Sequence, residues 1–244
     1  MSKTIVAVGC SHTFGSYLNA NSIEYKDECN PRSWATKLQQ QYYTDCDVVN
    51  LSMPGGSNTR SLRVLKEYIL DNLDRAKELI VFFGITDPCR IERISAKTVP
   101  GPAVDDLAGK PYVVNAIGPW CQCPWEDVQK YFDVHYGLFH NDEYENEQLN
   151  LEMISLHTFL KHFNIEHYLV GVLVAGDIFK ENKLIKELPL IDFGTTAIKY
   201  AKKCGYKVGR DFHPEIDCNH LDHDGNEFLA KEIFERMERI KNGT

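Results

Sequence analysis

Short, mostly apolar runs alternate with helical patterns along most of this 244-residue chain. The expected strands have the composition of strands covered on both faces, and they lie at about 3–8, 46–51, 78–83, 167–174 and, more weakly, 206–208. The expected helices separate and follow them, at about 33–42, 57–73, 145–163, 195–204 and 225–240. Strands that alternate with helices form parallel sheets with right-handed crossovers. We therefore predict an α/β protein, a three-layer α/β/α sandwich around a central parallel sheet of about five strands.

One segment, at about 88–145, breaks this alternation. It contains many aromatic residues, several prolines and two of the three tryptophans, and it shows little periodicity. That length is too great for a plain connection in a compact domain, so we expect an insertion with structure or function of its own. The chain is thus predicted to be a single domain over residues 1–244 with a large insertion after its third strand.

The composition restricts the classes of partner. The net charge is −8 and the Lys and Arg residues are dispersed, which argues against a nucleic-acid or anionic-membrane surface. No stretch approaches the ~20 apolar residues that cross a bilayer, and the first apolar run is too short for a signal peptide. The eight cysteines have no disulfide-framework spacing, so we expect reduced thiols in a soluble protein of cytoplasmic type. The sequence leaves the oligomeric state open.

Polar residues and glycines follow the carboxyl ends of the expected strands. Ser11 follows the first strand, Gly55 the second, Thr86 the third, and Asp217 with His220 follow the weak fifth strand. Ligands of parallel α/β sheets bind beyond the carboxyl ends of the strands. The sequence therefore predicts that these five residues meet at one edge of the sheet.

A hydroxyl, an imidazole and a carboxylate are the parts of a site for nucleophilic acyl transfer. Asp217 lies three residues before His220, so its carboxylate can reach one ring nitrogen and leave the other for the hydroxyl of Ser11. This pattern predicts Ser11 as nucleophile, His220 as general base and acid, and Asp217 as the residue that orients His220.

Other interpretations of these residues remain open. Ser11 is also a typical helix N-cap, and Asp217 with His220 could form an ordinary surface turn. A phosphate-binding loop is disfavoured because no Gly-Lys-Ser/Thr or Gly-x-Gly-x-x-Gly motif is present. His220 and His223 with a nearby aspartate have only a loose metal-site spacing, and Asp222 to Asp224 could simply cap the last helix. We expect neither a metal nor a cofactor.

Four ordered segments resemble the sequence blocks of the SGNH (GDSL-like) hydrolases, which are serine esterases and lipases with a flavodoxin-like sheet. The segments are 9–15, 50–58, 84–87 and 217–225, within a resemblance that covers about 3–87 and 165–240. The resemblance implies that Ser11 is the nucleophile, with Asp217 and His220 as its partners. It also implies an oxyanion hole made by the N–H groups of Ser11 and of a glycine, for which Gly55 fits the family spacing better than Gly56.

This sequence departs from the family in two of the blocks. Cys10 stands where the family has the aspartate of Gly-Asp-Ser, and Thr86 stands where it has an asparagine that donates to the oxyanion. A threonine hydroxyl can also donate a hydrogen bond, although its side chain is shorter. We therefore expect Ser11, Gly55 and Thr86 to form the oxyanion hole.

The insertion supplies the expected substrate contacts. Trp120, Trp125 and Tyr131 carry aromatic faces that could stack on sugar rings or pack acyl chains, or could form a small core of the insertion itself. We predict an esterase that acts on a small-molecule or carbohydrate ester, preferably a carbohydrate O-acetyl or other short acyl ester. The alternative is a catalytically weak or inactive SGNH-fold binding or structural module, which Thr86 and the insertion favour. A nucleotide-binding flavodoxin-like protein would need the phosphate loop that is missing.

Overall fold

The computed structural model describes residues 2–15, 32–94, 104–105, 113–116, 126–179, 187–208 and 220–243. Five strands form an all-parallel sheet in the order β2-β1-β3-β7-β8. They are β1 Thr4–Val8, β2 Asp47–Asn50, β3 Leu79–Ile85, β7 Glu166–Gly171 and β8 Leu190–Ile191. This is the flavodoxin-like order 2-1-3-4-5, in which the chain reverses direction across the sheet beside the first strand. The predicted α/β class and the five-stranded parallel sheet are confirmed.

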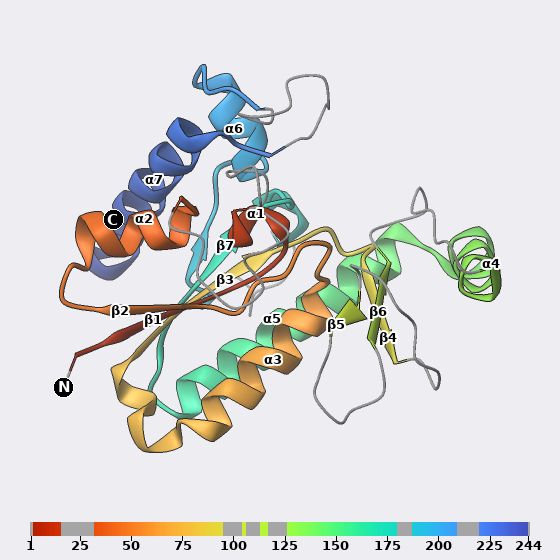
Figure 1. Cartoon of the computed structure of the whole chain (residues 1–244), viewed down its shortest axis with the longest axis horizontal. Coiled ribbons are helices and arrows are strands. Elements are labelled where there is room, and N and C mark those ends of the chain that lie inside the picture. Colours follow the sequence, from red (N-terminus) through yellow and green to blue (C-terminus); the bar gives the residue numbers. More distant parts are fainter. Residues whose placement is uncertain are drawn as a thin grey trace.

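Helices cover both faces of the sheet, as Figure 1 shows. On one face lie α2 Trp34–Tyr42, α6 Ala197–Lys203 and α7 His223–Asn242. On the other lie α3 Asn58–Asp71 and α5 Asp142–His162. Their apolar sides form two separate cores with the sheet between them. The chain thus forms the three layers that the sequence predicts.

The central strands supply both cores because successive side chains of a strand point to opposite faces. Ile5 and Phe82 pack with the helices of one face, whereas Val6 and Phe83 pack with those of the other. All four are fully buried. Continuous apolar strands are therefore required here, and this explains why the strand segments show no polar alternation.

The fifth strand lies elsewhere than the sequence pattern indicates. Residues 206–208 do not join the sheet, since Val208 forms only an isolated antiparallel bridge with Leu221. The edge of the sheet is β8, which directly follows Pro189 and is only two residues long. A pair of residues carries too little periodicity to be recognised in a sequence. Tyr206 and Val208 instead pack, partly buried, against the core beside α2, α6 and α7.

The insertion has its own structure beside the main sheet. Its strands β4 Ile91–Ile94, β5 Val104–Asp105 and β6 Val113–Ala116 form an antiparallel sheet in the order β4-β6-β5. Helix α4, Glu126–Val134, and a π-helical turn η2, His135–Phe139, then lead into α5. Figure 1 shows this part projecting to one side of the sandwich. A two-bonded ion pair between Arg63 of α3 and Glu92 of β4, at 2.7 and 3.2 Å, joins it to the main domain.

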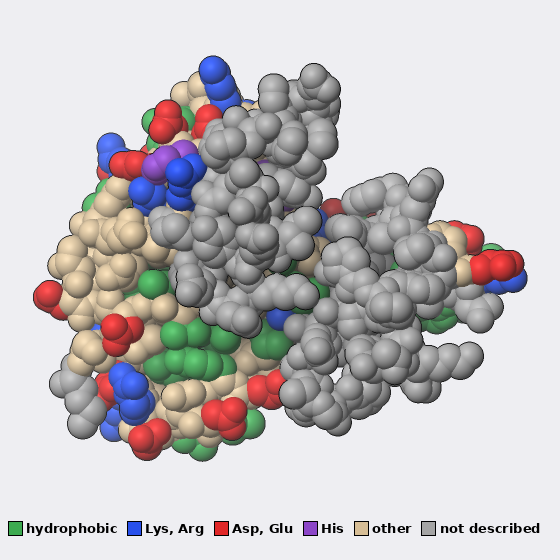
Figure 2. Space-filling view, viewed as in Figure 1, with side chains coloured by type: hydrophobic (Ala, Val, Ile, Leu, Met, Phe, Trp, Pro, Cys, Tyr) green, Lys and Arg blue, Asp and Glu red, His purple; other side chains and the backbone are tan. Residues whose placement is uncertain are grey.

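The charges on the surface are mixed. Figure 2 shows Lys and Arg interspersed with Asp and Glu over the described part of the visible face. Among the described residues, no helix has both the length and the apolar character that a membrane crossing requires.

Candidate active site

Ser11 opens the short turn of helix α1, Ser11–Phe14, immediately beyond the carboxyl end of β1. The N-cap position belongs to Cys10, whose side chain makes no capping bond, so the hydroxyl of Ser11 is not used as a cap. Ser11 is 7% exposed and lines a small pocket. A serine on a tight turn between strand and helix is held in one orientation, as a nucleophile requires.

The imidazole of His220 meets this hydroxyl. Its Nε2 lies 2.7 Å from Oγ of Ser11, although 209 positions separate the two residues in the sequence. The contact joins the turn that follows β1 to the segment that precedes α7. The two residues that sequence reasoning named as nucleophile and base are therefore in hydrogen-bonding distance.

A buried asparagine fixes the segment that carries His220. Asn226, in the first turn of α7, donates from Nδ2 to the carbonyls of Leu221 and Asp222, at 3.1 and 3.0 Å. Its Oδ1 accepts from the backbone N–H of Trp34 at the start of α2, at 3.1 Å. Asp222 is the N-cap of α7 and accepts from the N–H of Gly225 at 2.8 Å, which is the capping role expected for it. The position of His220 thus depends on the contact between α7 and α2.

Asp217 lies outside the described residues, and so do Trp120 and Trp125. The role of Asp217 at Nδ1 of His220 stays a prediction.

A second imidazole packs against His220. The ring of His12 is stacked on it with centroids 4.1 Å apart and 16° between the planes. Burial lowers the pKa of His12 well below its usual value, and the nearby charges of His220 and Arg90 lower it further. His12 is therefore neutral at neutral pH. Its position directly after the candidate nucleophile was visible in the sequence, but nothing there indicated a stacking partner.

Two glycines allow α1 to lie close to the sheet. The side-chain Oγ1 of Thr13 fills the space between Gly9 and Gly84, at the ends of β1 and β3. A Cβ atom on Gly9 would lie 2.5 Å from this oxygen, and one on Gly84 would also overlap it. Thr13 is fully buried, and its backbone carbonyl accepts from Nδ2 of Asn50 at 3.1 Å. These contacts hold the turn of Ser11 against the strand ends.

The loop after β2 forms a second wall of the site. The N–H of Met53 donates to the carbonyl of Gly9 at 3.1 Å, and the N–H of Gly56 donates to the carbonyl of Met53 at 3.0 Å. Gly55 has a φ of 76°, in the left-handed region that favours glycine. Among the described residues its N–H makes no hydrogen bond. Of the two glycines that sequence reasoning left open, Gly55 is therefore the one with an available donor.

The end of β3 forms the third wall. Asn58 holds the backbone of Thr86 with two hydrogen bonds: its Oδ1 accepts from the N–H at 2.9 Å, and its Nδ2 donates to the carbonyl at 3.0 Å. Thr86 is fully buried, and its Oγ1 has no hydrogen-bond partner among the described residues. Ser57 rather than Asn58 is the N-cap of α3, which leaves the amide of Asn58 for this role.

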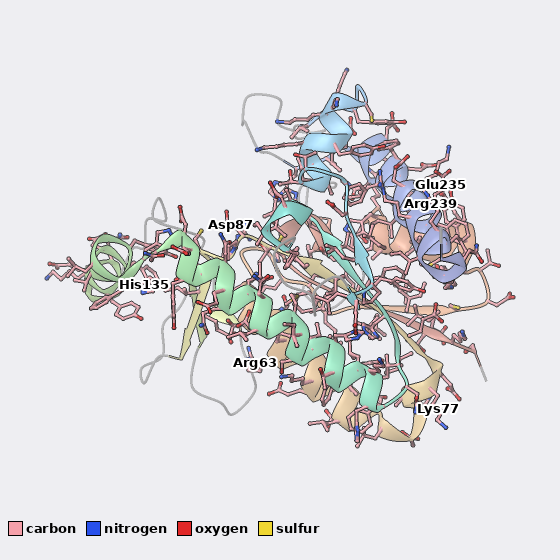
Figure 3. All side chains as sticks on the ribbon, turned by 180° about the vertical axis from the view of Figure 1, so that it is seen from behind. Arg63, Lys77, Asp87, His135, Glu235 and Arg239 are labelled. Carbon is pink, nitrogen blue, oxygen red and sulfur yellow. The ribbon has the colours of Figure 1, made fainter. Side chains whose placement is uncertain are left out.

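A cavity of about 430 Å³ adjoins these loops, where α3, α5 and the insertion meet. Polar groups make up most of its wall, together with two aromatic rings and a few apolar residues: Asn58, Thr59, Pro88, Arg90, Ile91, His135, Phe139, Tyr144, Glu145, Gln148, Leu149 and Glu152. Figure 3 shows Asp87 and His135 toward one end of α5 and Lys77, which precedes β3, toward the other. The cavity therefore lies at the carboxyl edge of the sheet, where the polar loops meet.

The cavity contains an acidic side chain with an unusual environment. Burial raises the pKa of Glu152, and the neighbouring charge of Glu145 raises it further. The hydroxyl of Thr59 opposes this effect by donating to Glu152 at 3.2 Å. Tyr131, expected to contact substrate, lies on α4 with 43% of its surface exposed, and its ring stacks on that of His135 at 6.2 Å. It is adjacent to the cavity wall rather than part of the wall.

Sequence comparison gives no relative: no protein-family model matches the chain, and no curated protein matches it. Solved structures do resemble it. TesA is 12% identical with a TM-score of 0.51, over 98% of this chain and 99% of that chain. The acetyl xylan esterase AlAXEase is 12% identical with a TM-score of 0.49, over 95% and 98% of the two chains. A lipase/acylhydrolase from Enterococcus faecalis is 14% identical with a TM-score of 0.49, over 97% and 96%. At 12% identity the likeness to TesA establishes the fold alone, and the chain therefore shares the α/β fold of that protein.

Proposed function

We propose that this chain is a serine esterase of SGNH type, which hydrolyses a short acyl ester through an acyl-enzyme on Ser11. The observation that carries the proposal is the 2.7 Å contact between Nε2 of His220 and Oγ of Ser11. A nucleophile and its base must lie within hydrogen-bonding reach, and these two come from opposite ends of the sequence. Both lie at the carboxyl edge of the sheet, where ligands of this architecture bind.

The reaction follows from these groups. Oγ of Ser11 attacks the ester carbonyl while Nε2 of His220 takes the hydroxyl proton, and Asp217 stabilises the imidazolium through Nδ1. The tetrahedral intermediate collapses, the alcohol leaves with the proton from Nε2, and the acyl group stays on Ser11. Water then attacks the acyl-enzyme with His220 again as base, and the acid is released. No metal or cofactor takes part in any of these steps.

Donors around Ser11 would hold the oxyanion that forms during attack. The N–H groups of Ser11 and Gly55 and the hydroxyl of Thr86 fill this role in the proposal. Two observations support it: the N–H of Gly55 and Oγ1 of Thr86 have no other hydrogen-bond partner among the described residues. Pre-oriented donors of this kind each contribute about 10²–10³-fold to turnover.

We propose a carbohydrate O-acetyl ester as the preferred substrate. The pocket lined by Ser11 and His220 is small, about 10 Å³, which is room for a group about the size of one water molecule. A pocket of this size has no room for a long acyl chain. The cavity of about 430 Å³ has the size and the density of hydrogen-bonding groups that a sugar requires. Trp120, Trp125 and Tyr131 remain the proposed aromatic contacts to the substrate.

The test compares hydrolysis of p-nitrophenyl acetate and butyrate by the wild type, Ser11→Ala and Ser61→Ala. Ser61 is the matched control because it is fully buried, its Oγ has no partner among the described residues, and it lies in α3. We expect Ser11→Ala to lose activity by at least about 10³-fold, with Ser61→Ala close to the wild type. Equal rates for the wild type and Ser11→Ala would reject Ser11 as the nucleophile.

A fluorophosphonate probe separates this proposal from the alternative of an inactive SGNH-fold binding module. Thr86 in place of the usual asparagine is the feature that favours the alternative. A working site forms a covalent adduct on Ser11, which mass spectrometry of the tryptic peptide locates. A wild type that binds acetylated sugars but never labels would support the binding module.

A further inference from the structure

The guanidinium of Arg90 is held beside the site without a carboxylate partner. Its Nη1 donates to the carbonyl of Gly56 at 3.4 Å, which is a long contact. Its Nε is buried and makes no hydrogen bond within the described part of the chain, and no carboxylate there forms an ion pair with it. A buried charged donor is normally paired, so an unpaired one at a site indicates a group that arrives with the substrate.

Three observations place this guanidinium near the reacting atoms. Gly56 directly follows Gly55, and its carbonyl belongs to the turn whose Met53 binds the carbonyl of Gly9, two residues before Ser11. The positive charge of Arg90 acts on the ring of His12, which is stacked on His220. Arg90 also lines the cavity of about 430 Å³. Arg90 therefore belongs both to the wall of the cavity and to the group of loops that surrounds the candidate nucleophile.

The chemistry of the site calls for a donor at this position. Ester attack turns a neutral carbonyl oxygen into an oxyanion, and Thr86, with its short hydroxyl, stands where the SGNH resemblance places an asparagine that donates to this oxyanion. Arg90 follows Thr86 by four residues in the same loop, one turn of backbone beyond Asp87, which is labelled in Figure 3. A guanidinium is planar, always charged and carries five donors, and its bonds to an anion are about twice as strong as neutral ones.

We propose that Arg90 is a catalytic residue whose guanidinium donates to the oxyanion and supplies the charge that compensates for the missing asparagine. The inference rests on the proposed esterase function. It differs from a purely structural role, in which Arg90 would only hold the carbonyl of Gly56. A structural role predicts lost stability, whereas a role at the oxyanion predicts lost turnover.

The experiment measures kcat and KM for p-nitrophenyl acetate with Arg90→Ala and Arg90→Lys. We expect kcat to fall about 10²–10³-fold in Arg90→Ala with KM changed by less than about threefold, because the bond forms only in the transition state. Arg90→Lys keeps the charge but loses the fork of donors, so its kcat should lie between those of the wild type and Arg90→Ala. Millimolar guanidinium chloride should restore part of the activity of Arg90→Ala in a saturable manner, whereas equal concentrations of urea or NaCl should not.

The matched control is Arg236→Ala. Arg236 also has a buried Nε without a partner among the described residues, but it lies in the second half of α7, where it binds the carbonyl of Asp192 and pairs with Glu232. The Arg236→Ala variant should be less stable than the wild type, keep its kcat within about threefold and show no rescue by guanidinium.

The inference is overturned if Arg90→Ala keeps at least a third of the wild-type kcat, or if the lost activity of Arg90→Ala is not rescued by guanidinium. If Arg90→Ala does not fold, a wild-type kcat in Arg90→Gln would overturn it equally. A wild type that neither hydrolyses esters nor labels at Ser11 rejects the esterase function itself, which is a separate result.

Discussion

His12 lies flat against His220, with ring centroids 4.1 Å apart and an angle of 16° between the planes. The ring that meets Ser11 is thus supported by a neighbour of Ser11 in the sequence. Burial together with the charges of His220 and Arg90 keeps the pKa of His12 low, so the supporting ring carries no charge that would oppose a proton on His220. His12 is a positioning residue in the proposed mechanism.

Replacing His12 tests this support. His12→Ala removes a buried ring, so we expect kcat to fall about 10- to 100-fold because His220 is no longer held in place. His12→Phe keeps a flat ring of similar size and should recover most of the activity. Steady-state kinetics of the two variants check this. Equal rates in His12→Ala and His12→Phe would exclude support by stacking.

Gly84→Ala should disturb both the fold and the site. The added methyl overlaps Oγ1 of Thr13, and overpacking of this kind costs about 1–3 kcal/mol in the free energy of unfolding. Thr13→Ala removes that oxygen, so the double variant should lose less than the sum of the single losses, by about 1 kcal/mol. Relief will be partial, because the new methyl would also lie 3.3 Å from Cγ2 of Val172. Urea denaturation of the four proteins gives the coupling, and strict additivity would contradict the contact.

Asn58→Ala should destabilise the protein through the backbone of Thr86. It leaves a buried N–H and a buried carbonyl without partners, and each such group costs about 1–3 kcal/mol. Turnover should fall as well, because Thr86 is no longer held at the site. Thermal unfolding and kinetics measure the two effects, and Thr59→Ser, a small change at the next residue, is the stability control.

Asn58→Asp gives a pH-dependent version of the same test. The new carboxylate can accept from the N–H of Thr86, but its second oxygen would face the Thr86 carbonyl. Protonation restores a donor there, so the folded state should bind the proton more tightly than the unfolded state. The stability of this variant relative to the wild type should therefore rise as the pH falls from 7 toward 4. A difference that does not change with pH would contradict the paired hydrogen bonds.

The free energy of unfolding of the wild type should decrease as the pH is lowered below about 6.5. His157 and His167 form a hydrogen bond of 2.8 Å between ring nitrogens, and Nδ1 of His167 lies 2.8 Å from the carbonyl of Ile165. Burial is the largest cause that lowers the pKa of both rings, so the folded state holds them neutral and the unfolded state takes up the protons first. Their contribution is fully present above the unfolded pKa and is lost as the pH falls below it. His157→Gln should make the pH dependence shallower in urea unfolding at pH 5 to 8. An unchanged slope would mean that this pair does not couple to pH.

The larger elements could be predicted from the sequence because each has a strong local signal. The apolar strands and amphipathic helices predict the layers, and Ser11 was correctly placed at the carboxyl end of the first strand. His220 was correctly predicted to meet Ser11, but for a partly wrong reason: the expected strand at 206–208 does not join the sheet, and His220 lies in the segment that precedes α7. The edge strand β8 could not be found, since two residues after a proline carry no periodicity.

The supporting contacts could not be predicted for a different reason. The bonds of Asn58 to Thr86, the stacking of His12 and the unpaired Nε of Arg90 depend on distances between separate loops. Composition and spacing determine which loops meet but not how their side chains pair. The choice between Gly55 and Gly56 likewise depended on which N–H the turn already uses.

The bond between Asn226 and the N–H of Trp34 has a consequence for synthesis of the protein on the ribosome. Ser11 emerges from the ribosome 209 residues before His220, and α7, which anchors His220, follows later still. A nascent chain that ends before α7 has the serine but not its base, and a serine hydroxyl without a base is a weak nucleophile. The hydrolytic activity that we propose would therefore arise only after α7 has been made and has packed against α2.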